Sequence, residues 1–241
     1  MNRSFQRSAV CALCVMMLVC LVAAGAMAQK KDKNAKRMQD AGRHASEAAQ
    51  VFRAIMGVTD KSIPRNLLDK AEAVAVFPGV IKAAFIVGGR GGQGVISRRI
   101  PGGWSAPAFF NLGGGSFGAQ IGATKTDYVL LIMNEAGVKG LMEDKFEIGG
   151  EIGAAAGPVG REASASTTPT LDAGILTYSR SKGLFAGVAI KGAVISPDND
   201  LNNAVYEGKS AREVLDREHS IKEIPAVVRV FPQTLSQYSR K

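Results

Sequence analysis

Few side chains in this sequence have the type and spacing that catalysis requires. His44 and His219 are the two histidines of the chain, and neither lies beside a plausible nucleophile or in a zinc-binding spacing such as H-E-x-x-H. Glu147 and Glu151 would share one face of a strand, as a catalytic carboxylate pair does, but charged residues are mostly solvent-exposed and no further partner is clustered with them. We therefore predict no enzyme activity, no catalytic residues, no metal site and no cofactor.

The glycine-rich segment at residues 88–94 contains the spacing G-x-G-x-x-G, which is typical of dinucleotide binding. That fingerprint requires a helix directly afterwards and an acidic residue about 20 positions further on. Residues 95–100 instead favour a strand, and the next acidic residue is Asp127. We therefore exclude nucleotide binding and expect a glycine-rich hairpin here.

Basic residues are the side chains best suited to a binding role. The formal net charge of +9 favours anionic partners. Twelve basic residues near turns or in the N-terminal region are the candidate lipid-binding residues: Lys30, Lys31, Lys33, Lys36, Arg37, Arg90, Arg98, Arg99, Lys125, Arg180, Lys182 and Lys191. Gathered at one end of the fold, each would contribute about 1 kcal/mol near an acidic membrane. Scattered over the surface, they would only keep the protein soluble, and the sequence leaves both arrangements open.

The N-terminus has the features of a Sec-type signal peptide over residues 1–28. Arg3 and Arg7 precede an apolar run from residue 9 to residue 24, and small residues lead up to a cleavage site after Ala28. A retained membrane anchor is the alternative, although the apolar run is short for a stable span. All three cysteines lie in this leader, and its removal lowers the net charge to +7 because the two arginines leave with it. We expect a protein located in the periplasm or at the periphery of the cell envelope, with a membrane rather than nucleic acid as its partner.

A helix and a set of glycine-rich strands must position any binding residues. Alanines recur at helical spacing between Ala41 and Phe52, which predicts an amphipathic N-terminal helix. This helix would pack on the core or lie in a membrane interface, and its small alanines favour packing. Residues 117–124 alternate between apolar and small side chains, which predicts a strand with room for close approach or strong curvature.

The remaining pattern predicts an α+β fold: a curved antiparallel sheet or small, partly closed β-barrel with peripheral helices. Further strands are expected at residues 73–77, 83–87, 95–100, 104–108, 128–133, 146–155, 171–179 and 184–195, and short helices at 62–70, 134–142 and 210–217. Residues 29–36 would form a basic linker, and residues 37–217 the domain. Residues 218–241 would form a tail in which two prolines limit regular structure.

Several separated segments resemble one known family. The sequence of residues 109–120, together with the apolar run at 128–134, resembles the corresponding motifs of the SYLF family. The resemblance extends to residues 75–80 and 175–187. SYLF domains are the lipid-binding domains of yeast actin-patch proteins, of an animal SH3-containing homologue and of plant FYVE proteins, and many bacterial relatives consist of this domain alone. The resemblance covers roughly residues 37 to 217.

The resemblance implies a non-enzymatic domain that binds anionic phospholipid, with phosphoinositide-like headgroups or a membrane surface as the partner. The yeast members also bind actin, but we do not expect actin as a partner in the compartment that a signal peptide indicates. The alternative function is a periplasmic protein–protein interaction or envelope-structural module with an envelope protein as its partner.

Overall fold

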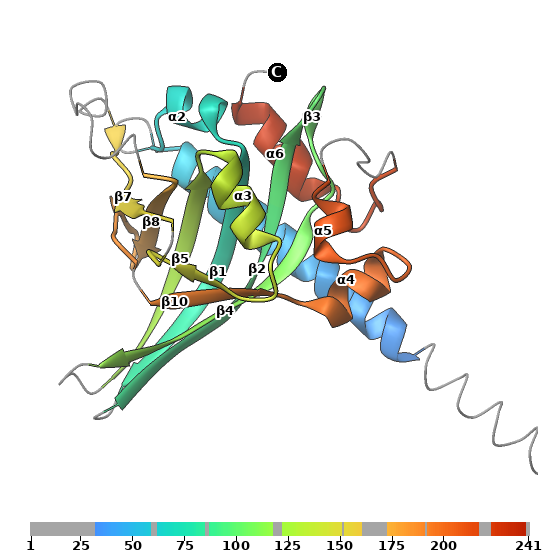
Figure 1. The fold of residues 1–241 in the computed structure, drawn as a ribbon, viewed down its shortest axis with the longest axis horizontal. Coiled ribbons are helices and arrows are strands. Elements are labelled where there is room, and N and C mark those ends of the chain that lie inside the picture. Colours follow the sequence, from blue (N-terminus) through green and yellow to red (C-terminus); the bar gives the residue numbers. More distant parts are fainter. Residues whose placement is uncertain are drawn as a thin grey trace, which may run out of the picture.

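The computed structural model describes residues 32–58, 62–84, 87–117, 122–150, 152–160, 173–190, 192–216 and 223–239. The predicted signal peptide and residues 29–31 of the predicted basic linker lie outside these residues. Within them, one strongly curved sheet is crossed on one face by an N-terminal helix, residues 32–56, which passes behind the sheet in Figure 1. The helix thus begins inside the range expected to be a linker.

The strands form one ten-stranded sheet in the order β6-β10-β4-β2-β1-β5-β8-β7, with β3 paired to β2 and β9 to β8. They are β1 (Ala73–Ala84), β2 (Val87–Ile100), β3 (Gly103–Trp104), β4 (Ala108–Phe117), β5 (Gly122–Ile132), β6 (Phe146–Ile148), β7 (Ala154–Ala156), β8 (Ile175–Ser181), β9 (Leu184–Gly187) and β10 (Ala193–Pro197). All neighbouring strands are antiparallel except β7 and β8. The predicted α+β fold with a curved, partly closed sheet is confirmed.

The N-terminal helix packs on the core through its alanine stripe. Ala41, Ala45, Ala48 and Phe52 have no exposed surface, because side chains this small allow a helix to approach a sheet closely. The sequence left open whether this helix packs on the core or lies in a membrane interface. In the structure it packs on the core.

Strand β1 continues through Pro78 and Gly79, where the sequence predicted that it would stop. The register of β1 shifts here against both β2 and β5, which marks a β-bulge. Gly79 has a φ of +56°, a conformation that glycine adopts without steric cost. The proline and glycine therefore bend the strand instead of ending it.

The glycine-rich segment 88–94 is part of β2 and not the predicted hairpin. A Cβ atom at Gly94 would lie 2.3 Å from the backbone oxygen of Val76, and one at Gly92 would lie 2.8 Å from a methyl carbon of Val80. The glycines therefore allow β1 and β2 to approach closely. After the glycines, β2 continues as a strand to Ile100. The helix that a dinucleotide-binding fingerprint requires at this position is therefore not formed.

Four strands end together at what we call the distal end of the sheet. Ala84 pairs with Gly122, and Val87 pairs with Phe117, so β5 and β4 flank the β1–β2 hairpin on its two sides. These strands project beyond the helices in Figure 1. The predicted strand 117–124 is therefore wrong: β4 ends and β5 begins within it, and residues 118–121 lie outside the described residues.

Other boundaries differ from the prediction for local reasons. The expected strand 146–155 is interrupted at Gly149, which has a φ of +80°, and the expected strand 184–195 divides into β9 and β10. The expected strand at 104–108 shortens to β3, and the start of the one at 171–179 lies outside the described residues. The described helices of the remaining chain are α2 (Arg65–Lys70), α3 (Glu135–Leu141), α4 (Asn199–Val205), α5 (Ala211–Val214) and α6 (Val230–Tyr238).

The C-terminal tail contributes α6 to the packed structure, which the sequence analysis did not predict. Phe231 and Leu235 are fully buried. Pro232 lies in the first turn of the helix, where a backbone N–H has no partner within the helix and its loss costs little. Among the described helices, none is both long enough and apolar enough to cross a bilayer.

Candidate functional site

A polar groove of about 610 Å³ lies between the N-terminal helix and the sheet. We call it the helix–sheet groove. Its helix wall carries Arg43, His44, Glu47, Gln50, Val51 and Ala54, its floor Pro78, Gly79, Ile81, Gly91, Gly92 and Gln93, and its far wall Lys125, Asp127 and Arg180. A Cβ atom added to Gly91 would meet nothing within 4 Å. The missing side chain on β2 therefore helps to keep the groove open.

Asp127 organises the far wall of the groove. Its Oδ1 accepts a hydrogen bond from the backbone N–H of Gly79 at 2.8 Å. Its Oδ2 accepts two from Arg180, from Nε at 3.0 Å and Nη2 at 2.8 Å. The charge of Arg180 is thus neutralised by an ion pair that joins β8 to β5 and to the bulge of β1.

Lys125 lies beside this ion pair but remains available to a ligand. A Cβ atom at Gly79 would be only 2.3 Å from Cε of Lys125, so the lysine stem lies across the glycine. Within the described part of the chain, no carboxylate pairs with its ammonium group. Lys125 is therefore the cation of the groove that is best placed to meet an anion.

The helix wall of the groove is electrically mixed. Arg43 lies 3.3 Å from a carboxylate oxygen of Asp40 and 3.4 Å from one of Glu47. His44 is only 6% exposed, and burial, followed by the positive charge of Arg43, lowers its pKa below the ordinary value of 6.5. The neutral imidazole accordingly accepts from Arg43, whose Nη2 lies 3.4 Å from Nε2.

The structure brings four of the twelve candidate cations to the side of the sheet near the distal end: Arg90, Lys125, Arg180 and Lys182. Lys182 lies in the exposed β8–β9 turn, and the Ser181 hydroxyl before it bonds the backbone oxygen of Lys125 at 3.4 Å. Lys82, which the sequence analysis missed, is exposed and pairs directly with Arg90. Lys82 is the one charged residue in the apolar run 80–87. This isolated position is the only sequence feature that could have identified it.

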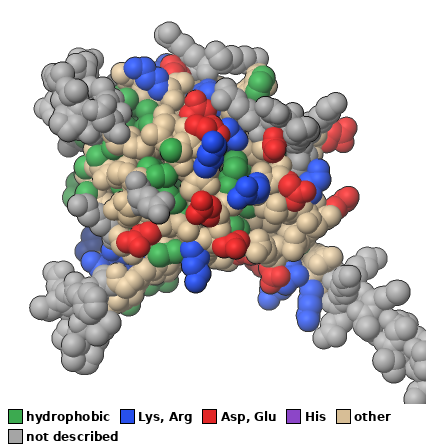
Figure 2. All heavy atoms as spheres, in the orientation of Figure 1, with side chains coloured by type: hydrophobic (Ala, Val, Ile, Leu, Met, Phe, Trp, Pro, Cys, Tyr) green, Lys and Arg blue, Asp and Glu red, His purple; other side chains and the backbone are tan. Residues whose placement is uncertain are grey.

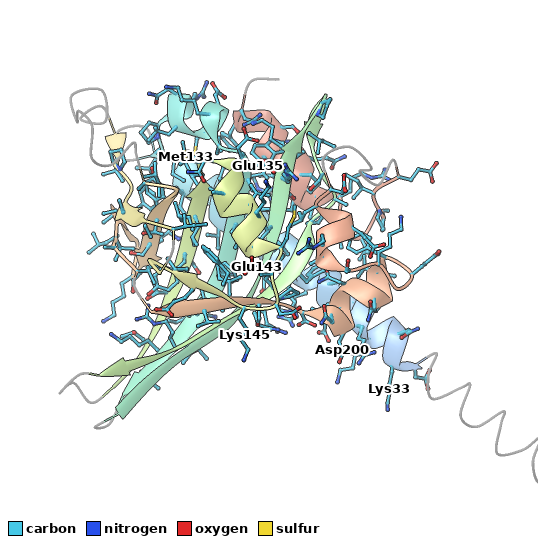
Figure 3. All side chains as sticks on the ribbon, in the orientation of Figure 1. Lys33, Met133, Glu135, Glu143, Lys145 and Asp200 are labelled. Carbon is cyan, nitrogen blue, oxygen red and sulfur yellow. The ribbon has the colours of Figure 1, made fainter. Side chains whose placement is uncertain are left out.

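Arg98 and Arg99 lie at the opposite end of β2, about 26 Å from Arg90 at the rise of a strand. Arg98 is 6% exposed, and its Nη2 contacts both carboxylate oxygens of Glu135, at 2.9 and 2.7 Å; Figure 3 labels Glu135 on α3. Arg99 donates to the backbone oxygens of Ala71 and Leu68 and lies over the ring of Trp104. Both guanidinium groups thus have partners within the fold.

The remaining candidates lie elsewhere. Lys33, Lys36 and Arg37 occupy the first turns of the N-terminal helix, where Arg37 pairs with Asp200 of α4 at 2.7 Å. Figure 3 shows Lys33 and Asp200 in that corner, away from the projecting strands. Lys30, Lys31 and Lys191 lie outside the described residues, as do His219 and Glu151. Figure 2 shows acidic and basic side chains interspersed over the face that carries α3.

Two exposed apolar residues accompany the cations near the distal end. Leu184 is 77% exposed and Ile81 is 56% exposed, the highest values among the large hydrophobic residues that the structure describes. Ile81 pairs with Lys125, and Leu184 follows the turn that contains Lys182. We call the following set the collar: Ile81, Lys82, Arg90, Lys125, Lys182 and Leu184.

Beyond the collar, the four strands β1, β2, β4 and β5 continue for about three residues to the distal end, a length of about 10 Å. We call this part the tip; its described residues are 83–84, 87–89, 115–117 and 122–124, and none of them is charged. The site therefore consists of an uncharged tip, the cations and apolar side chains of the collar behind it, and a polar groove that begins at the collar.

The curved sheet, the open groove and the collar define a binding domain. Within the described residues, no group of three or more side chains is arranged to hold a metal ion. The carboxylate pair considered in the sequence analysis, Glu147 and Glu151, includes a residue outside the described residues, Glu151.

Residues 113–238 match the model of the Ysc84 family, described as Las17-binding protein actin regulator. The chain therefore belongs to this family, which is the SYLF family. It is 36% identical over 187 residues to LAS seventeen-binding protein 3 of Saccharomyces cerevisiae, a match that covers 76% of this chain and 39% of that protein. It is 33% identical over 169 residues to SH3 domain-containing YSC84-like protein 1 of Homo sapiens, covering 67% of this chain and 49% of that protein. The chain thus spans less than half the length of these relatives. The name of the yeast relative describes a binding protein.

Proposed function

We propose that this protein is an exported, non-enzymatic domain that associates with anionic phospholipid surfaces in the periplasm or at the periphery of the envelope. The observation that carries the proposal is the collar, in which four cations and two exposed apolar side chains lie near one end of the sheet. The signal-peptide pattern of residues 1–28 and the basic composition of the chain support it.

Electrostatic attraction supplies only part of the affinity. At about 1 kcal/mol for each cation near an acidic surface, the four collar cations contribute roughly 4 kcal/mol. That free energy corresponds to a dissociation constant of about a millimolar. Tighter binding therefore needs either contact of the apolar collar residues with lipid or a specific headgroup site.

The helix–sheet groove suits a phosphorylated polar headgroup. Its volume of about 610 Å³ is in the usual range of ligand pockets. Lys125 would meet the phosphate oxygens. The side chains of Gln50, Glu47 and Gln93 would bond hydroxyl groups of a phosphoinositide-like headgroup.

Co-sedimentation with vesicles tests this function. The chain from residue 29 onward should bind vesicles that contain phosphatidylglycerol, bind pure phosphatidylcholine poorly, and lose binding as salt rises. Equal binding to both vesicle types, or binding that salt does not change, would contradict the proposal.

A charge-matched pair of variants separates the collar from net charge. Lys125→Glu with Lys182→Glu should abolish most binding, whereas Lys33→Glu with Lys36→Glu, which makes the same change in net charge at exposed sites, should preserve most of it. Equal losses in the two variants would mean that binding follows net charge and not the collar.

A protein–protein interaction module is the second candidate function. It is favoured by the yeast relative's name, which describes binding to another protein. An envelope protein recovered at fixed stoichiometry with the intact chain, together with no vesicle binding, would favour this function.

A further inference from the structure

We propose that the domain docks on the bilayer end-on, with the tip inserted and the collar at headgroup level, while the N-terminal helix stays packed on the sheet. This inference rests on the proposed lipid-binding function. It identifies the element that enters the membrane and the orientation of the domain.

The N-terminal helix has no free apolar face to insert. Phe52 and Ile55 are at most 1% exposed and Val51 is 6% exposed, while Met38 and Met56 are partly buried against the core. The alanines of the stripe, Ala41, Ala45, Ala48 and Ala49, have no exposed surface. Its outward side carries Arg43, Glu47 and Gln50, which line the groove. Insertion of this helix would uncover the core, so the lipid contact must come from another element.

The collar residues lie on both faces of the sheet. Directly paired residues of neighbouring antiparallel strands project to the same face, and successive residues project to opposite faces. Ile81 and Lys125 form such a pair on the helix face, so Lys82 and its partner Arg90 project from the opposite face.

Leu184 also projects from the opposite face. Its partner is Ser181, whereas the preceding Arg180 pairs with Asp127 on the helix face. A flat membrane laid against either face would therefore reach only one half of the collar. Approach along the strands brings both halves to the surface together.

The tip is uncharged, and its four strands are paired with one another to their ends. Its described residues carry no charge, and the ladders β4–β2, β2–β1 and β1–β5 extend to Phe117, Val87, Ala84 and Gly122. Backbone groups between these strands are thus already hydrogen-bonded. Within the described residues, the outer edges of β4 and β5 have no partner strand at the tip, so the tip enters the headgroup and interfacial region, where water can bond those edges, and not the apolar centre of the bilayer. A tip of about 10 Å matches the depth at which interfacial segments are buried.

Single-cysteine labelling tests the orientation. The chain from residue 29 onward contains no cysteine, so Ala83→Cys, Leu184→Cys and Val227→Cys can each carry one environment-sensitive fluorophore without background. All three positions are exposed, and Val227, at 37%, lies on the C-terminal segment beside Gly42.

On vesicles containing phosphatidylglycerol, labels at residues 83 and 184 should brighten and shift to the blue, and lipids brominated in the acyl chain should quench residue 83 more strongly. The label at 227 should not respond. A response at only one of residues 83 and 184, or a response at 227, overturns end-on docking. Binding with no response at any position also overturns it, and leaves the proposed function standing.

A disulfide lock tests whether the helix stays packed. A Cβ atom at Gly42 would lie 3.8 Å from Cβ of Val227, which is the mean separation in disulfides. The double variant Gly42→Cys with Val227→Cys should therefore fasten the helix to the C-terminal segment when oxidised. Oxidised and reduced forms should bind vesicles equally; binding by the reduced form alone would show that the helix has to leave the sheet. If the unmodified chain binds no vesicles, the proposed function itself fails.

Discussion

The carboxylate of Asp127 accepts the backbone N–H of Gly79 at 2.8 Å, and this bond holds the bulge of β1 against β5 at the floor of the helix–sheet groove. The same carboxylate neutralises Arg180. One acidic residue thus fixes the shape of the groove and removes one positive charge from its wall, while Lys125 beside it keeps its charge available.

Replacing Asp127 with Asn should separate these two roles. The amide oxygen still accepts from Gly79, but the ion pair with Arg180 is lost, so we expect a loss of about 1–2 kcal/mol in the free energy of unfolding. The freed guanidinium should strengthen binding to acidic vesicles. Urea denaturation and co-sedimentation measure the two effects; weaker vesicle binding by a folded variant would contradict this account of the groove.

Gly79→Ala tests the bulge directly. An alanine at a φ of +56° costs about 1–2 kcal/mol, and its Cβ would also displace the stem of Lys125. Gly91→Ala is the matched control on the neighbouring strand, because its Cβ meets nothing within 4 Å. We expect the first variant to unfold at lower denaturant and the second to match or exceed the unsubstituted protein; equal midpoints would show that the bulge has no special conformation.

Local sequence signals predicted the elements that local chemistry determines. Asn134 caps α3 by accepting from the N–H of Gly137, and Ser210 and Glu213 form a capping box at the start of α5, so the helices expected at 134–142 and 210–217 begin where these residues stand. The alanine spacing predicted the N-terminal helix and its buried face. The family resemblance was also correct, because its motifs are spread along most of the chain.

The sequence could not predict features that depend on distant contacts. The glycine content of residues 88–94 indicates a turn. Gly92 and Gly94 are instead required because β1 leaves no room for a side chain at these positions, which is visible only once the strands are paired. Lys125 and Lys182 come together only because β5 pairs with β8. Arg98 and Arg99 are adjacent basic residues, which suggested a lipid-binding surface patch. In the folded protein Arg98 bonds Glu135 and Arg99 bonds the backbone oxygen of Ala71, and these contacts depend on tertiary packing that the sequence does not reveal.

Arg98 should prove important for stability and not for vesicle binding. Arg98→Ala removes a guanidinium that bonds both oxygens of Glu135 and the backbone oxygen of Leu215. Since Glu135 is half-exposed and water can solvate it after the change, we expect a loss of about 1.5–3 kcal/mol. Arg98→Lys should recover little of it, because an ammonium group lacks the planar fork. Vesicle binding by the folded fraction should be unchanged, and a loss comparable to that of the collar variants would return Arg98 to the lipid-binding set.

His44 should make the stability of the domain depend on pH. Its pKa is lowered in the folded protein by burial and then by Arg43, against the opposing charges of Glu47, Asp40 and Asp198. As the pH falls below the ordinary value of 6.5, the unfolded chain takes up a proton that the folded protein does not, so the stability present above pH 6.5 is lost as the pH falls through the folded pKa. His44→Gln keeps a polar side chain of similar reach without the titration. Urea denaturation of both proteins across this pH range should give a steeper loss of stability for the unsubstituted chain, whereas parallel curves would mean that protonation of His44 is not coupled to folding.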